Sequence, residues 1–173
     1  MRRPNESEYG APHRRYVDLV PETDIVSALD LQAAVIERWP ARVDHEQETL
    51  AYAEGKWTPR QVVGHLSDVE RVFCYRALRL SRRDSTPLPG FDENPYVAHS
   101  EYATVPFQML VAELVALRRA NLPLFRRLDE TSWSASGEAS GMAISVRAIA
   151  YTMVGHVRHH VNVLRERYGL TLD

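Results

Sequence analysis

Apolar residues recur at intervals of three or four positions in four long segments of the chain. In the first segment this spacing is followed by Ile25, Leu29, Ala33 and Ile36, which places them on one face of a helix. No segment shows a convincing alternation of period two, the pattern of a half-buried strand. The pattern therefore predicts an all-α protein with helices over residues 22–39, 59–82, 106–128 and 145–168.

Local signals mark the start of the second helix and the end of the fourth. Thr58 precedes Pro59, and Gln61 lies three residues after Thr58, which is the pattern of a capping box with proline in the first turn. Gly169 follows the last periodic residue of the fourth helix, where a left-handed residue often ends a helix. These two boundaries therefore rest on cap chemistry as well as on periodicity.

The connection between the second and third helices, residues 83–104, is too long for a simple helical hairpin. Its sequence DSTPLPGFDENPYVAHSEYA contains three prolines and a glycine, so it cannot be regular helix throughout. A connection of this length can cross the bundle from end to end and make the second and third helices parallel. We expect one domain over residues 1–173, a four-helix bundle with up-down-down-up order and an N-terminal arm over residues 1–20. The long connection would be either a lid or a strut.

The second predicted helix carries apolar residues on two sides. Val62 and Phe73 lie on one side, and Val63, Cys74 and Leu78 lie near the other. A helix that is apolar on two sides is usually central to a bundle or part of a subunit interface. The second apolar face therefore suggests a homodimer.

Composition excludes several classes of function. The 173 residues carry a formal net charge of −2 and no basic stripe, so nothing favours nucleic-acid binding. A single cysteine, Cys74, excludes an intrachain disulfide and suits a reducing compartment. No run approaches the roughly 18 apolar residues of a membrane span, and the N-terminus lacks the apolar core of a signal peptide. We therefore expect a cytoplasmic protein with neither a nucleic-acid nor a membrane partner.

Three histidines on apolar helix faces carry the strongest chemical signal. His156 and His160 lie one turn apart on the face of the fourth helix that carries Ile149 and Met153. His65 lies on the apolar face of the second helix, near its start. If these two helices are antiparallel neighbours, all three rings reach a similar height in the core. Three inward imidazoles suit one divalent metal ion, and three hydrogen-bonded core histidines without a metal are the alternative.

Other polar residues near these histidines have weaker claims. His159 lies at the edge of the apolar stripe, so we expect it not to bind the metal. Asp68 lies three residues after His65, where it would orient a ligand ring or act as a base, or else remain a surface carboxylate. Arg76 lies on the His65 face and, if buried, needs a partner, for which Asp92 is the expected one. That ion pair would fix the long connection rather than bind substrate.

A resemblance to the DinB superfamily, close to its YfiT-like branch, rests on three stretches that occur in order: GKWTPRQVVGHLSDVERVFCYRALR, PLPGFDENPY and AYTMVGHVRHHVNVLRERY. The resemblance covers most of the chain. It implies a four-helix bundle with a long crossover and a metal site of three histidines, here His65, His156 and His160. Members of this family are described as metal-dependent hydrolases, and some relatives are thiol-dependent transferases or isomerases.

The neutral ligands of such a site indicate its chemistry. They leave the charge of a divalent ion uncompensated and leave coordination positions open, which is typical of catalytic sites. Zinc or nickel is the expected ion, with iron, manganese and copper as alternatives. The ion would activate water or hold the thiolate of a low-molecular-weight thiol. The expected function is therefore hydrolysis or thiol transfer on a small molecule, and the alternative is a non-enzymatic metal-binding bundle that binds a ligand or a partner.

Overall fold

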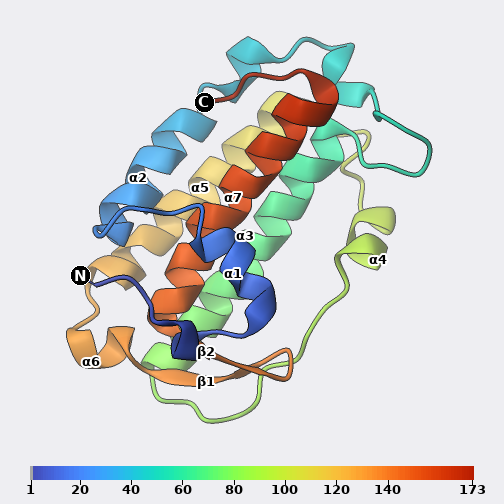
Figure 1. The fold of residues 1–173 in the computed structure, drawn as a ribbon. Coiled ribbons are helices and arrows are strands. Elements are labelled where there is room, and N and C mark those ends of the chain that lie inside the picture. Colours follow the sequence, from blue (N-terminus) through green and yellow to red (C-terminus); the bar gives the residue numbers. More distant parts are fainter. Residues whose placement is uncertain (1) are drawn as a thin grey trace.

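Four long helices form the bundle in the computed structural model, which describes residues 2–173 (Figure 1). They are α2 (Ile25–Ile36), α3 (Pro59–Ser81), α5 (Phe107–Arg126) and α7 (Val146–Tyr168). Shorter helices lie between and before them, namely α1 (Arg14–Val17), α4 (Glu93–Ala98) and α6 (Glu130–Trp133). Single 3-10 turns are η1 (Glu6–Glu8), η2 (Ala11–His13), η3 (Trp39–Arg42) and η4 (Gln47–Thr49). The prediction of an all-α four-helix bundle is confirmed.

The order of helix directions is up-down-down-up. Figure 1 shows α2 and α7 running in one direction and α3 and α5 in the other, with the chain returning along the outside of the bundle through α4. α3 packs against α5 and α7, and α2 packs against the same two helices. α3 and α7 are therefore antiparallel neighbours, which is the arrangement that brings the three histidines to one height.

Side-chain caps determine where the long helices begin. The N–H of Gln61 donates to Thr58 Oγ1 at 3.3 Å, and the N–H of Thr58 donates to Gln61 Oε1 at 2.9 Å, which confirms the capping box. Gly169 ends α7 with a φ of 71°. α2 begins later than predicted because the Asp24 carboxylate accepts from the N–H of Ser27 at 3.0 Å and caps the helix there.

An antiparallel hairpin lies where the sequence indicated only a loop rich in serine and glycine. β1 (Ser136–Ala139) pairs with β2 (Met142–Ser145). Ser140 and Gly141, between the strands, have φ values of 54° and 73°. Positive φ at both central residues gives a tight turn whose twist matches that of the strands. Each strand has four residues, too few for an alternating pattern to be recognised in the sequence.

The crossover is held at both of its ends. Near its start, the N–H of Leu88 donates to the carbonyl of Glu138 at 2.9 Å, and its carbonyl accepts from the N–H of Ser140 at 3.0 Å. Near its end, the Tyr102 ring lies directly on Gly64 of α3, where an added Cβ would be 2.2 Å from the ring. These contacts bind the crossover to the hairpin and to α3.

The expected ion pair between Arg76 and Asp92 is not formed, and that prediction was wrong. Arg76 Nη2 donates instead to the carbonyl of Pro89 at 2.8 Å and to Ser140 Oγ at 2.9 Å. Asp92 accepts from the N–H of Asn94 at 3.0 Å and so caps α4. Because Asp92 stands at a helix start, its carboxylate is satisfied locally.

The N-terminal arm packs against α7 through α1. Val17 of α1 and the following Val20 are buried, and α1 lies along α7. The approach is close because position 155 is glycine: an added Cβ there would lie 2.0 Å from the carbonyl oxygen of Tyr16. The arm is therefore part of the folded bundle, and it brings Tyr16 beside α7.

Gly155→Ala should detach this arm. Alanine gains about 1 kcal/mol of helix propensity over glycine, but the obstructing atom is the backbone oxygen of Tyr16, which cannot rotate away. We expect a net loss of about 1–3 kcal/mol in the free energy of unfolding and faster tryptic cleavage after Arg14 and Arg15. Urea denaturation and limited proteolysis measure both. Gly90→Ala is the control, since an added Cβ there meets nothing closer than 3.4 Å; equal behaviour of the two variants would contradict the prediction.

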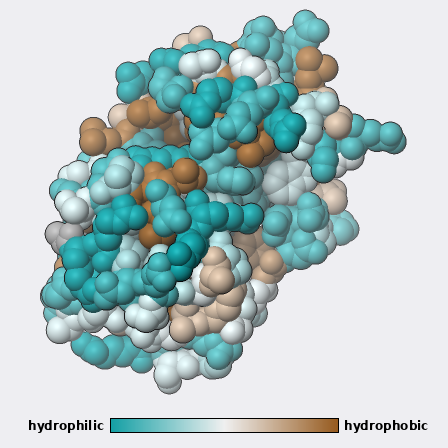
Figure 2. Space-filling view, in the orientation of Figure 1, coloured by the Kyte–Doolittle hydropathy of each residue, from teal (hydrophilic) through white to brown (hydrophobic). Residues whose placement is uncertain are grey.

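The exposed hydrophobic residues bear on assembly. On the face shown in Figure 2, hydrophobic residues form separate small patches among hydrophilic ones. Val63, one basis of the homodimer prediction, is buried in the core, Cys74 is half-buried, and Leu78 is 42% exposed. The homodimer stays a prediction. Within residues 2–173, no helix combines the length and the hydropathy that crossing a membrane requires.

Candidate metal centre

Three histidine rings meet between α3 and α7. His65 comes from α3, and His156 and His160 come from α7. The Nε2 atom of His156 lies 3.2 Å from Nε2 of His65 and 3.2 Å from Nε2 of His160. One ring nitrogen from each residue lies within 4.8 Å of the other two. The structure thus brings together the three residues singled out in the sequence, and we call them the histidine cluster.

The way these rings meet fits a metal ion better than a hydrogen-bond network. A neutral imidazole has one N–H and one lone pair, so Nε2 of His156 can complete a hydrogen bond with only one of its two neighbours. A divalent ion accepts a lone pair from all three nitrogens. Two nitrogens held about 2.0–2.1 Å from a tetrahedral ion lie about 3.3 Å apart, close to the observed 3.2 Å.

Burial keeps the rings of the histidine cluster neutral. Desolvation lowers the pKa of His65 to about 4. Desolvation also lowers the pKa values of His156 and His160 well below their ordinary value, and the neighbouring rings add to this shift. Neutral imidazole is the form that binds metal, so the lone pairs are available at neutral pH. His160 is half-buried, while His65 and His156 are buried.

Sequence comparison places the chain in a family. The profile of the DinB superfamily matches residues 28–164. The chain belongs to the DinB superfamily. Two relatives from Oceanobacillus iheyensis, each named "putative metal-dependent hydrolase", are 26% identical to it over 122 and 123 residues, which is 69% of this chain and 69% of each relative.

Two solved structures share the DinB fold. YfiT from Bacillus subtilis, described as "a probable metal-dependent hydrolase with an unusual four-helix bundle topology", matches with a TM-score of 0.77 at 20% identity over 96% of this chain and 93% of YfiT. A mycothiol-dependent maleylpyruvate isomerase matches with a TM-score of 0.66 at 19% identity over 90% of this chain and 63% of the isomerase. This chain therefore spans less than two thirds of that isomerase. The YfiT-like bundle predicted from the sequence is confirmed.

Aromatic rings surround the histidine cluster of this DinB protein. The Trp57 ring lies 4.9 Å from the ring of His65, between centroids. The Tyr16 ring meets the rings of His156 and His159 edge-on, at 5.2 and 5.6 Å. Sequence reasoning missed Tyr16 because the arm carries no periodic pattern.

A repeated Gly-His pair is the signal that was available for these neighbours. The glycine before His65 lets the Tyr102 ring approach α3, and the glycine before His156 lets the backbone of Tyr16 approach α7. A glycine inside a helix costs stability, so its presence beside a buried histidine indicates a close approach by another segment. The first pair marks where the crossover packs on α3, and the second marks where the arm reaches the histidine cluster.

The remaining candidate residues of the DinB site are placed as follows. Asp68 is half-buried, and its Oδ1 accepts from the hydroxyl of Tyr102 at 2.7 Å; a role in orienting a ligand ring stays a prediction. His159 lies outside the group of converging nitrogens. Burial raises the pKa of the Cys74 thiol to about 11, which makes it a weak nucleophile at neutral pH.

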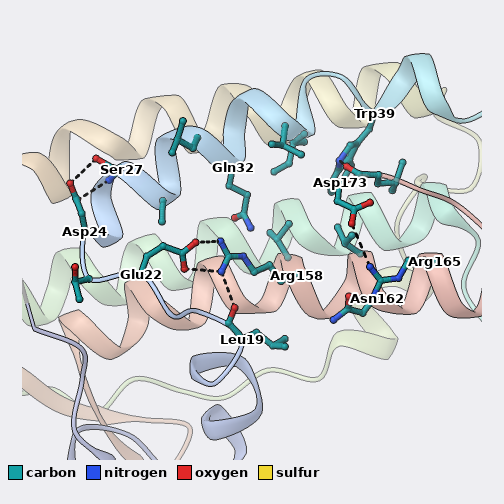
Figure 3. A pocket seen from close by; sticks show the side chains of 18 residues that line it. Leu19, Glu22, Asp24, Ser27, Gln32, Trp39, Arg158, Asn162, Arg165 and Asp173 are labelled. Atoms are coloured by element: carbon teal, nitrogen blue, oxygen red, sulfur yellow. Dashed lines mark hydrogen bonds and ion pairs between the residues drawn. The ribbon is translucent and has the colours of Figure 1, made fainter.

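A second concave feature is separate from the histidine cluster. Figure 3 shows a groove between α2 and α7, with a volume of about 840 Å³. Its lining is largely apolar, and at its edge the Glu22 carboxylate accepts from both Nη atoms of Arg158 at 2.6 and 2.9 Å. None of the three clustered histidines lines this groove. It is therefore not the pocket of the candidate metal centre.

Proposed function

We propose that this DinB protein is a metal-dependent enzyme that holds one divalent ion on His65, His156 and His160 and acts on a small molecule. The observation that carries the proposal is the meeting of three neutral imidazoles through their Nε2 atoms, at 3.2 Å from the central one. Zinc or nickel is the expected ion, since imidazole nitrogen is a good ligand for both. When bound, the ion would supply Lewis-acid activation of water or of a thiol.

The chain's own residues would orient the ligands and limit access. Trp57 packs on His65 and Tyr16 packs on His156. Apolar surroundings of this kind control the access of solvent to a metal site. The hydroxyl of Tyr102 holds the Asp68 carboxylate in place. Asp68 is our candidate for accepting a proton from the substrate or for orienting a ring.

Hydrolysis is the first reaction class, because the two relatives from Oceanobacillus iheyensis are named for it. Thiol transfer is the second, supported by the shared fold of a mycothiol-dependent isomerase; a low-molecular-weight thiol would then be a substrate. A cytoplasmic location suits either reaction. A metal-binding bundle without turnover is the non-enzymatic alternative.

The test compares metal-loaded and chelator-treated protein in two assays. Protein purified without a His-tag is first analysed for its metals, and about one divalent ion per chain is expected. Loaded protein is then assayed for hydrolysis of p-nitrophenyl esters and for conjugation of a thiol to a chlorinated aromatic electrophile. We expect turnover in one assay that chelation abolishes and the ion restores. Tightly bound metal without turnover in either assay would favour the non-enzymatic bundle, and failure to bind any divalent ion would overturn the proposal.

A further inference from the structure

Arg76 differs from every other buried arginine in residues 2–173. Three such arginines have a carboxylate partner: Arg60 pairs with Glu48 at 2.6 Å, Arg118 with Glu70 at 2.9 Å, and Arg147 with Glu8 at 3.1 Å. Arg76 is 4% exposed, yet its guanidinium donates only to a carbonyl and a hydroxyl. A buried charge without a counter-charge is costly. The bundle therefore keeps one buried cation that an anion would stabilise.

The hydrogen bonds of Arg76 leave donors free. Nη2 uses both of its N–H groups, on Pro89 and Ser140. Nε and Nη1 donate to no residue of the described chain, and neither atom is sealed from solvent. The rings of Phe73 and Phe91 lie 5.6 and 6.0 Å from the guanidinium carbon. Aromatic faces attract the positive charge, but they do not replace a carboxylate or phosphate as acceptor for the remaining N–H groups.

Arg76 belongs to the same helix face as the histidine cluster. It follows His65 by eleven residues, which is about three turns and roughly 16 Å along α3, with only about 20° of rotation. Long helical side chains lean toward the helix N-terminus, which is the end that carries His65. His65 and Arg76 are therefore aligned along one face of α3, with Val69 and Phe73 between them.

Polar groups lie between the histidine cluster and Arg76. Thr152 precedes His156 by one turn of α7, and its Oγ1 lies 3.5 Å from Nδ1 of His13 in the arm. Burial, and then the nearby charge of Arg76, lower the pKa of His13, so His13 is neutral and adds no competing cation. The His13 ring also lies 6.3 Å from the Phe73 ring. Thr152 is fully buried and its hydroxyl donates to the carbonyl of Ala148 at 2.8 Å, so the half-buried His13 is the polar group that remains between the two sites.

We propose that Arg76 binds the carboxylate or phosphate group of an elongated small-molecule substrate whose reactive part lies at the histidine cluster. This inference rests on the proposed function, because it assigns the substrate class of that site. The opposing interpretation is that Arg76 only joins the crossover to the hairpin through Pro89 and Ser140. A joining role would need Nη2 alone and no anion.

Isothermal titration calorimetry on zinc-loaded protein tests the proposal with two probes, succinate and inorganic phosphate. We expect the wild-type protein to bind at least one of them. Tighter binding of succinate would indicate a preference for a carboxylate, and tighter binding of phosphate would indicate a preference for a phosphate group. Arg76→Gln should weaken that binding about 10- to 100-fold, as expected for loss of a charged hydrogen-bond donor. Arg76→Lys, which keeps the charge, should lose less. Arg79→Gln, on an arginine already paired with Asp84, should stay within about twofold of wild type.

A third variant separates anion binding from the joining role. Ser140→Gly removes one hydrogen bond of Arg76 and suits the positive φ at that position, so it should leave probe binding unchanged. Equal losses of probe affinity in Ser140→Gly and Arg76→Gln would overturn the proposal. Wild-type affinity in Arg76→Gln would also overturn it, because the anion would then bind elsewhere. Binding of neither probe by zinc-loaded wild type would also overturn it. If the protein does not take up zinc, that result counts against the proposed function instead. Probe binding by this zinc-free protein that is lost in Arg76→Gln would still support the anion site.

Discussion

His156→Ala should abolish stoichiometric metal binding. His156 is the central ring of the histidine cluster, since its Nε2 alone lies 3.2 Å from both neighbours. Its removal leaves His65 and His160 on different helices with no ligand between them. Loss of a residue that merely supports a metal ligand costs about 10–100-fold in affinity, so loss of the central ligand should cost at least about 100-fold. Metal content after equilibration with a competing chelator measures the change.

His159→Ala is the matched control for this experiment. His159 lies in the same turns of α7 and also meets the Tyr16 ring, but its nitrogens do not belong to the converging group. Its replacement should leave metal content unchanged. A folded His156→Ala protein that still holds about one ion per chain would exclude the histidine cluster as the site. Equal losses in the two variants would contradict the assignment of helix faces.

Local signals explain why α3 and α7 could be predicted well. Thr58 and Gln61 fix one end of α3, and Gly169 fixes one end of α7. The apolar periodicity of α3 and α7 then identifies the face of each helix that points into the bundle, and the clustered histidines lie on those faces. The opposite directions of the two helices followed from the length of the crossover, and their packing against each other was a condition of the prediction. Signals within each helix, together with the length of the crossover, were therefore sufficient to predict the histidine cluster.

Contacts between distant segments could not be predicted in the same way. Arg76 was expected to meet Asp92, but both side chains found other partners, because a local cap satisfied the carboxylate. Tyr16 reaches α7 only because position 155 is glycine, and no regular pattern in the arm indicates that approach. Such contacts depend on how distant segments pack against each other. The sequence pattern indicates the structure of each segment but not its packing partner.

Glu70→Ala should destabilise the bundle more than any surface substitution. Glu70 and Arg118 are 2% and 1% exposed, and the guanidinium donates to both carboxylate oxygens at 2.9 Å through Nε and Nη2. Asn121 adds a bond to the same carboxylate at 3.0 Å. Removing the carboxylate leaves a buried, uncompensated charge between α3 and α5. Losses of this kind are about 3–5 kcal/mol in the free energy of unfolding.

Glu37→Ala is the control that isolates the effect of burial. Glu37 accepts from Arg119, the neighbour of Arg118, at 2.6 Å, but both side chains are 53% exposed. Exposed pairs contribute about 0–1 kcal/mol, so urea denaturation should separate the two variants by about 2 kcal/mol or more. Equal stabilities would mean that water reaches Arg118 when Glu70 is absent. Replacing Glu70 and Arg118 together with Leu and Met should recover much of the loss, because the penalty comes from the unpaired charge rather than from the missing bond.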